Sequence, residues 1–481
     1  MNSAENNLDC NAKIDASCRV PLLALFGGAA LWLVAGLLLA LLASLTFHEP
    51  EVFAGCPFMT YGHIAPAAND LLVYGFAVPA ALGVMLWIFA RLSQAELVLP
   101  LVPVAAANLW HLGVLVGLAT ILCGGSSGYT WLEFPRASAM LLGASFVLIA
   151  ISAVATFGQR KERELYPSHW FLLAALLWFP WIYSTANLFL VTTHPVRGVT
   201  QAVINWWFAN NLVFVWLALV GVGVAFYFLP KFAGRPLQSR FYALFAFWTL
   251  ILFGTWCGIP QSAPVPAWLP ALSSVASSLL IIPLIAIAII VVKTVFGAAV
   301  SCKGGPFCYI KFGTVAFLLS GLMLIASACP HFSRMTDFTW FGPAQTQLQI
   351  LGFFAIVICG AIYDLLPRVM DFELPFPKFV RVQHWLFMLG GVLLAGSLAV
   401  AGVEQGLKLY SPEAALPALR ISTLGLFFLL LGSLLFAANI FAMTLKWKLA
   451  LLKTVVAYIK SPLETSSASV SLRRDQGEVK P

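Results

Sequence analysis

Charged residues are scarce in this sequence. They make up 10% of its 481 residues, whereas hydrophobic residues make up 61%. Soluble globular proteins contain about 25% charged residues, so this composition excludes a soluble fold and predicts a polytopic membrane protein. The net charge of +8 lies mostly in short loops and in the tail, where charge sets membrane topology. A nucleic-acid partner is therefore not expected.

Histidine is also rare, and cysteine motifs are absent. The chain has seven histidines, with none between His194 and His331 or between His331 and His384. A copper site needs imidazoles or thiolates close together on facing helices, so these segments argue against one. The nine cysteines include no C-x-x-C-H motif, which excludes covalently attached c-type haem. Cys56 and Cys123 fall in predicted external loops and are either bridged or free thiols.

Long apolar runs fill the rest of the chain. A bilayer core requires about 20 apolar residues per helix, and by this criterion the sequence predicts an all-α membrane bundle of twelve spans. They cover residues 20–46, 65–92, 101–122, 137–158, 168–193, 199–229, 237–259, 271–296, 307–329, 344–366, 381–404 and 418–444.

The charges predict an orientation. Placing the N-terminus in the cytoplasm leaves only five basic residues outside: Arg136, Arg197, Arg334, Lys408 and Arg420. Because cytoplasmic loops are enriched in Lys and Arg, both termini are expected in the cytoplasm. The predicted organisation is a cytoplasmic segment at 1–19, a membrane domain at 20–444 and a cytoplasmic tail at 445–481. The tail is expected to be disordered because its end has few apolar groups to bury.

Two segments, NWWFANNLVFVWLALVGVGVAFYFLPK at residues 205–231 and YGHIAPAAND at residues 61–70, resemble subunit I of the haem-copper oxidases, above all the cbb3-type cytochrome c oxidases. Asn205–Lys231 is similar to the family's sixth helix, where WWYGHN precedes an apolar run ending in Pro-Lys. The copper-binding histidine of that pattern is replaced by Asn210. Tyr61–Asp70 resembles the entry to the second helix, and Ala68 occupies the position of a haem-binding histidine.

The resemblance extends over essentially the whole chain. Thr336–Thr339 and Gly352–Phe353 bracket the tenth helix with the family's spacing, and its two haem-binding histidines fall on Gly342 and Ala344. The seventh helix of the family supplies two more copper ligands and a tyrosine, but this chain has Gly258–Ser262, GIPQS, there. The resemblance therefore implies the twelve-helix fold of oxidase subunit I without its haem and copper ligands, and no cofactor is expected.

Polar groups inside the spans must find partners, since an unpaired amide or carboxyl in hydrocarbon costs several kcal/mol. We expect the amides to hydrogen-bond across the space that cofactors fill in the family, with Asn210 pairing with Gln345 or Gln347. His111 is deep in a span and is either a hydrogen-bonded core residue or a haem, quinone or proton-relay group. The candidate network comprises Asn69, Asp70, His111, Tyr183, Asn210, Asn211, Gln345 and Gln347.

Three functions remain open from the sequence. The first is a non-catalytic structural or accessory subunit of a respiratory electron-transfer complex in a bacterial-type inner membrane. The second is a catalytic oxidase with haem b and copper, passing electrons from cytochrome c or quinol to oxygen or nitric oxide. The third is a conduit for protons or small solutes. Expected partners are the lipid bilayer and other respiratory subunits, with a cytochrome c as a further candidate.

Overall fold

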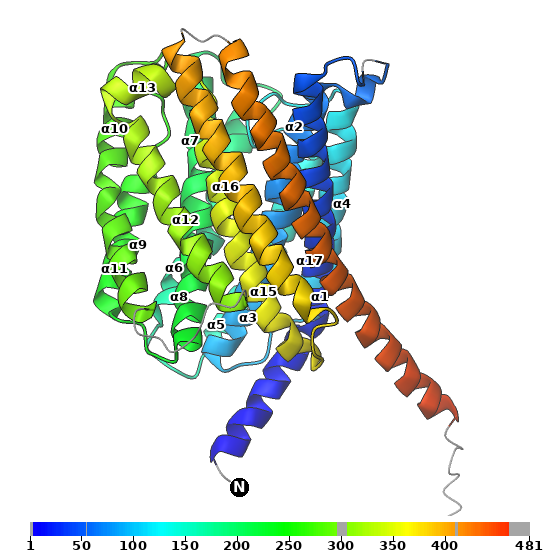
Figure 1. The fold of residues 1–481 in the computed structure, drawn as a ribbon. Coiled ribbons are helices and arrows are strands. Elements are labelled where there is room, and N and C mark those ends of the chain that lie inside the picture. The colour runs from blue at the N-terminus through cyan, green and yellow to red at the C-terminus, as the bar shows by residue number, and fades with distance from the viewer. Residues whose placement is uncertain (1–2, 54, 296–304, 409–411, 461–481) are drawn as a thin grey trace, which may run out of the picture.

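The computed structural model describes residues 3–53, 55–295, 305–408 and 412–460. These residues form a bundle of helices joined by short loops, and no strand occurs among them (Figure 1). The predicted all-α fold is therefore confirmed.

The helices follow one another along the chain with few long connections. The first half contains α1 (Ser3–His48), η1 (Pro57–Met59), α2 (Tyr61–Asp70), η2 (Leu71–Ala77), α3 (Val78–Ser93), α4 (Leu101–Leu122), α5 (Arg136–Gly158), α6 (Pro167–Leu190), α7 (Val199–Asn210), η3 (Asn211–Trp216) and α8 (Leu217–Ala233). The second half contains α9 (Arg240–Gly254), α10 (Trp268–Leu279), α11 (Ile281–Val295), α12 (Pro306–Ser327), α13 (Pro330–Thr336), α14 (Phe341–Gln347), η4 (Leu348–Ala355), α15 (Ile356–Met370), α16 (Pro377–Leu407) and α17 (Pro412–Lys460).

The described residues include eleven helical spans long and apolar enough to cross a membrane. The predicted seventh span, 237–259, is the exception, because its helix α9 has only 15 residues. At 1.5 Å per residue this helix is roughly 22 Å long, which is shorter than the hydrocarbon core of about 30 Å. The chain then leaves the helix at Gly254 and reaches α10 through an irregular segment. That segment contributes to the candidate site.

Three spans form the centre of the bundle. They are α2-η2-α3, α7-η3-α8 and α14-η4-α15, and their most apolar 18-residue windows are 100%, 100% and 89% buried. The other spans are 39% to 56% buried in the same measure, since one side of each faces outward. A helix that is apolar on all sides belongs in the interior, and these three sequences have that pattern. Each of the three also contains a π-helical stretch near its middle.

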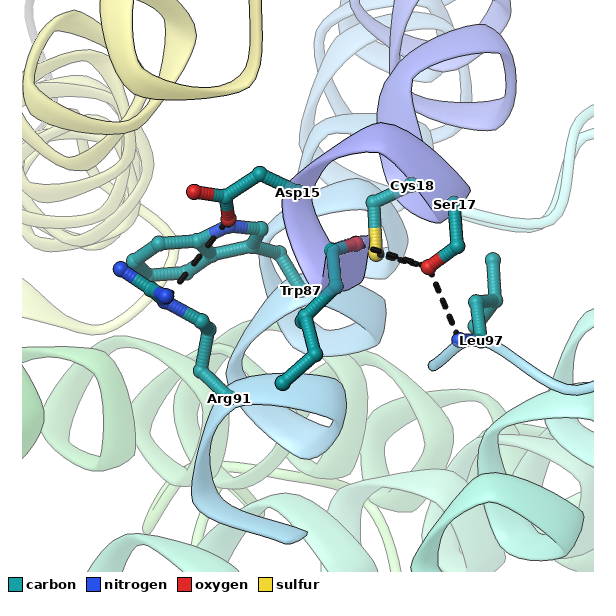
Figure 2. A network of polar contacts seen from close by, with 7 residues as sticks. Asp15, Ser17, Cys18, Trp87, Arg91 and Leu97 are labelled. Atoms are coloured by element: carbon teal, nitrogen blue, oxygen red, sulfur yellow. Dashed lines mark hydrogen bonds and ion pairs between the residues drawn. The ribbon is translucent and has the colours of Figure 1, made fainter. Parts of the chain in front are cut away.

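The N-terminal part of α1 is attached to the bundle through side chains (Figure 2). The indole Nε1 of Trp87 donates to Asp15 Oδ1 at 2.8 Å, and Arg91 Nε lies 3.7 Å from the same oxygen. Close by, the backbone N–H of Leu97 donates to Ser17 Oγ at 2.9 Å. The predicted N-terminal segment, residues 1–19, is therefore helical from Ser3 and is packed against α3 over its last turns.

Helix α17 continues to Lys460, so the first part of the predicted tail, residues 445–460, is helical. The beginning of α1 and the end of α17 project from the same end of the bundle (Figure 1). The disorder expected for residues 461–481 concerns a segment outside the described residues.

Of the two alternatives for Cys56 and Cys123, a bridge or two free thiols, the structure has the second. Both residues are free thiols in the structure, Cys123 exposed and Cys56 half-buried. The alternative of two unpaired cysteines therefore holds for these loops.

Candidate functional site

The three central helices are distorted next to the positions that the resemblance aligns with haem or copper ligands. The π-helical stretches begin three residues after Ala68, one residue after Asn210 and four residues after Ala344. π-Helical turns are rare in proteins as a whole. Where they occur, they are often found at functional sites. The backbone is therefore irregular, as it is at many functional sites, beside Ala68, Asn210 and Ala344. None of these three side chains is a usual metal ligand.

A cavity of about 450 Å³ is lined by residues of these three helices together with residues of α10, of α12 and of the loop after α9. This volume is within the range of about 300–1,000 Å³ typical of small-molecule sites. Two of the positions that the resemblance aligns with metal ligands, Asn210 and Gly342, line this cavity. The other polar side chains in its wall include Asn69, Asn205, Asp337, Gln345 and Gln347. Four of the predicted amides, Asn69, Asn210, Gln345 and Gln347, therefore line one cavity, whereas Asn211 does not.

The backbone around this cavity is strained. Trp131 and Phe338 both line it, and both have positive φ angles, of 65° and 59°. Large L-residues rarely adopt this region, and such strain clusters at functional sites. Gly258, with φ 93°, also lines the cavity, and a Cβ added there would lie 2.4 Å from the Cβ of Asn210. A glycine is required at this position for the loop after α9 to approach Asn210.

Asn210 does not pair with Gln345 or Gln347. Its Nδ2 donates to the backbone carbonyl of Gly254 at 2.8 Å, at the end of α9. Gln345 Nε2 instead donates to Ser320 Oγ at 3.1 Å, and Gln347 Oε1 is buried without a protein partner. The predicted pairing across the cavity is therefore wrong, because the shortened α9 offers Asn210 a nearer carbonyl.

The neighbouring Asn211 is fully buried and faces other helices. Its Nδ2 donates to the carbonyls of Trp207 at 2.9 Å and Thr255 at 3.2 Å, and its Oδ1 accepts from Trp178 Nε1 at 3.2 Å. Asn210 and Asn211 together fix the end of α9 to the central helix. The polar groups thus form several local sets of hydrogen bonds, not one continuous network.

Asn210→Leu is expected to lower the free energy of unfolding by about 0.5–2 kcal/mol, the range for interhelical hydrogen bonds in membranes. The substitution leaves the Gly254 carbonyl without this donor. Denaturant unfolding in mixed micelles measures the change. The matched control is Asn108→Leu on α4, whose Nδ2 bonds only within its own helix, to Val104 O at 3.0 Å. Equal losses in the two variants would contradict an interhelical role for Asn210.

A second, smaller cavity of about 250 Å³ adjoins the first, and Asn69, Pro343 and Gln347 line both. Ala68 is in its wall, whereas Ala344 is fully buried and lines neither cavity. The volume of this second cavity is below the usual range for drug-sized ligands. His48 also lines it, and the Nε2 of this histidine is already hydrogen-bonded to Thr423 Oγ1 at 3.0 Å.

Asp70 and Tyr183 lie close to the loop between α4 and α5. Asp70 is completely buried, its Oδ2 accepts from the N–H of Glu133 at 3.1 Å, and its Oδ1 has no protein partner. Glu133 accepts from Ser126 Oγ at 2.6 Å. Burial raises the pKa of the Glu133 carboxyl, and the Ser126 hydrogen bond opposes that rise. The Tyr183 ring packs 5.9 Å from that of Tyr74, so it contributes to the same cluster by ring contacts.

His111 has the environment of a core histidine. Trp32 Nε1 donates to its Nδ1 at 3.2 Å, and its Nε2 lies 3.2 Å from the carbonyl of Ala24. This pattern is satisfied by a neutral ring protonated on Nε2, which leaves no lone pair free for a metal. A Cβ at Gly28 would lie 2.2 Å from the ring, so this glycine provides the space for His111.

No other cluster in the described part of the chain provides a metal site. Within residues 3–53, 55–295, 305–408 and 412–460, no group of three or more His, Cys, Asp or Glu side chains is placed to hold a metal ion. Both ring nitrogens of His169 and Nδ1 of His384 are buried without a hydrogen-bond partner, but neither histidine lines the two cavities.

Residues 20–407 match the family model described as Cytochrome C and Quinol oxidase polypeptide I. This match covers most of the membrane domain.

Individual proteins show the same likeness. The chain is 25% identical over 388 residues to a Cbb3-type cytochrome c oxidase subunit CcoN1 of Stutzerimonas stutzeri, covering 78% of this chain and 81% of that protein. It is 25% identical over 452 residues to a cytochrome c oxidase subunit 1 of Rhodobacter capsulatus, covering 86% and 83%. A cryo-EM structure of a heme-copper terminal oxidase dimer superposes with a TM-score of 0.72 at 15% identity, covering 90% of this chain and 84% of the other. The last comparison shows a shared fold.

Proposed function

Because this chain belongs to the family of cytochrome c and quinol oxidase polypeptide I, we propose that it is a non-catalytic member of it, retained as a structural or accessory subunit of a respiratory electron-transfer complex. One observation supports the proposal most: the aligned ligand positions hold Ala68, Asn210, Gly342 and Ala344. Of these side chains only Asn210 has a polar atom to offer, and its amide nitrogen donates to Gly254 O.

The residues present do not fit haem and copper. Alanine and glycine side chains have no lone pair for a metal, and copper in proteins prefers imidazole or sulfur ligands. Two imidazoles at one depth on neighbouring helices would be needed for a bis-histidine haem. His111, the one histidine deep in a span, has both ring nitrogens in hydrogen-bond contact with its neighbours. No reaction step through either cofactor is therefore assigned to this chain.

A shared fold alone does not carry an activity, since function depends on the site. The chain retains the helical bundle. Three buried central helices with π-helical turns are surrounded by apolar helices that face outward. Such a surface suits contacts with lipid and with other membrane subunits. We place the protein in a bacterial-type inner membrane, with both termini cytoplasmic and other respiratory subunits, and a cytochrome c, as candidate partners.

The proposal is tested by oxygen consumption of the purified chain with reduced cytochrome c or quinol as donor. The expected rate equals that of protein-free detergent, and added haem and copper do not raise it. Turnover by the isolated chain that is abolished by Asn210→Leu at unchanged stability would establish the catalytic alternative. Donor-independent proton or solute flux in vesicles would favour the conduit.

The double substitution Ala68→His and Ala344→His is expected to yield no low-spin haem. The cavity beside Ala68 has only about 250 Å³, and Ala344 is completely buried outside it. Interiors are close-packed, so a haem would require the surrounding helices to separate. The measurement is an absorption spectrum of the purified variant after incubation with haem, with unaltered protein as the control. A bis-histidine spectrum at one equivalent would show that the family's haem pocket persists.

A further inference from the structure

Helix α17 is longer than a membrane span. It has 49 residues, about 73 Å at 1.5 Å per residue, whereas a bilayer with its headgroups is about 40–45 Å thick. Met443 is the last fully buried residue, and no residue from Thr444 to Thr454 is buried. In Figure 1 this part of α17 leaves the bundle on the same side as the N-terminus. The segment Leu445–Thr454 is called the α17 extension below.

The α17 extension is basic and apolar at once. Lys446, Lys448 and Lys453 are all exposed, and α17 has no acidic residue after Glu413. Lys446 and Lys453 are seven residues apart, which places them within about 20° of one another around the helix. The sequence has another lysine after the same interval, at position 460. Lys448 lies about 160° from Lys446 around the helix, so the lysines flank on both sides a strip formed by Leu445, Leu449 and Leu452.

Four leucines of the extension are not covered by protein in the described structure, whereas Trp447 is partly buried against the core. Leu445, Leu449, Leu451 and Leu452 are all exposed. A helix in which lysines flank a strip of exposed leucines is of the type that binds in the interface of a bilayer. Lysine stems also pass along apolar surface while their ammonium groups reach the headgroups.

Charge and position identify the occupant of this surface. The extension begins where the predicted span 418–444 ends, so lipid headgroups are within reach of its first turn. Clusters of lysine directly after a span bind anionic lipids, and no carboxylate on the extension opposes them. We propose that the α17 extension binds the anionic headgroups of the leaflet on the side where the start of α1 and the end of α17 project, with its leucines in the acyl boundary. This binding is independent of whether the chain is catalytic.

Hydrogen exchange of the full-length protein in nanodiscs tests the proposal. Amide exchange within residues 445–454 is measured in phosphatidylcholine and in phosphatidylcholine mixed with phosphatidylglycerol. Each lysine near an anionic surface contributes about 1 kcal/mol to binding, which corresponds to about a factor of five in the binding constant. Exchange is therefore expected to be at least about tenfold slower in the anionic nanodiscs, and high salt should remove the difference.

The test variant is Lys446→Gln with Lys448→Gln and Lys453→Gln, which is expected to abolish the lipid dependence. The control variant replaces three exposed lysines elsewhere, Lys161, Lys311 and Lys378, by Gln and removes the same charge. It is expected to keep the lipid dependence. Equal exchange in both lipids, or the same loss in both variants, would overturn the proposal. Protection that appears only with a co-purified protein would also overturn it, because the surface would then belong to that partner.

Discussion

Replacing Trp216 by alanine is expected to lower the free energy of unfolding by about 3–5 kcal/mol, the range for removing a large aromatic side chain from a packed core. Trp216 is completely buried in η3, and its Nε1 donates to the carbonyl of Ala175 at 3.0 Å. Its ring lies 5.4 Å from that of Phe179 and 6.4 Å from that of Phe354. The substitution removes these contacts and leaves a buried carbonyl without its donor.

This prediction follows from the proposed absence of cofactors. If no haem is bound, the centre of the bundle must be stabilised by its own side chains, and Trp216 joins three helices there. The control is Trp248→Ala on α9, where the side chain is 58% exposed. It is expected to change stability by less than about 1 kcal/mol, because exposed positions leave no cavity. Similar losses in the two variants, measured by denaturant unfolding in mixed micelles, would contradict the importance of the central packing.

Gly402→Ala is expected to destabilise the protein by about 1–3 kcal/mol, the cost of inserting atoms into a packed region. A Cβ at Gly402 of α16 would lie 2.2 Å from the backbone nitrogen of Phe341, which begins α14. A backbone atom cannot rotate away as a side chain can, so α14 must move. Because Phe341 and Gly342 line the large cavity, the substitution is also expected to change the shape of that cavity.

The matched control is Gly396→Ala in the same helix, where nothing lies within 4 Å of an added Cβ. It is expected to be neutral or to stabilise by up to about 1 kcal/mol, since alanine is the better helix former. Both variants make the same glycine-to-alanine substitution in the same helix, so they differ only in which of the two positions is changed. A Gly402→Ala protein as stable as the Gly396→Ala protein would show that α14 is free to shift.

The fold could be predicted from sequence because membrane helices are recognisable as long runs of apolar residues. The central spans are apolar on all sides, and they are the buried ones in the structure. The length of the seventh span, 237–259, is overestimated from sequence because residues 254–258 are apolar enough to be predicted as helix. Only the packing of the loop against Asn210, with φ 93° at Gly258, ends the helix early.

The candidate site could be predicted only in part. The amides at positions 210, 345 and 347 were singled out from sequence, and they do line one cavity. Their partners could not be predicted, because the carbonyl that Asn210 reaches is exposed by the early end of α9. The positive φ angles of Trp131 and Phe338 and the π-helical turns had no local sequence signal, since tertiary packing imposes them.

The measurement that tests the central claim most directly is the haem and metal content of the purified full-length chain. A pyridine haemochrome assay gives haem per chain, and elemental mass spectrometry gives copper and iron. The account predicts far less than one equivalent of haem and of copper, with an absorption spectrum that shows protein alone. One or more equivalents of haem, retained through purification, would contradict it and return the chain to the catalytic members of its family.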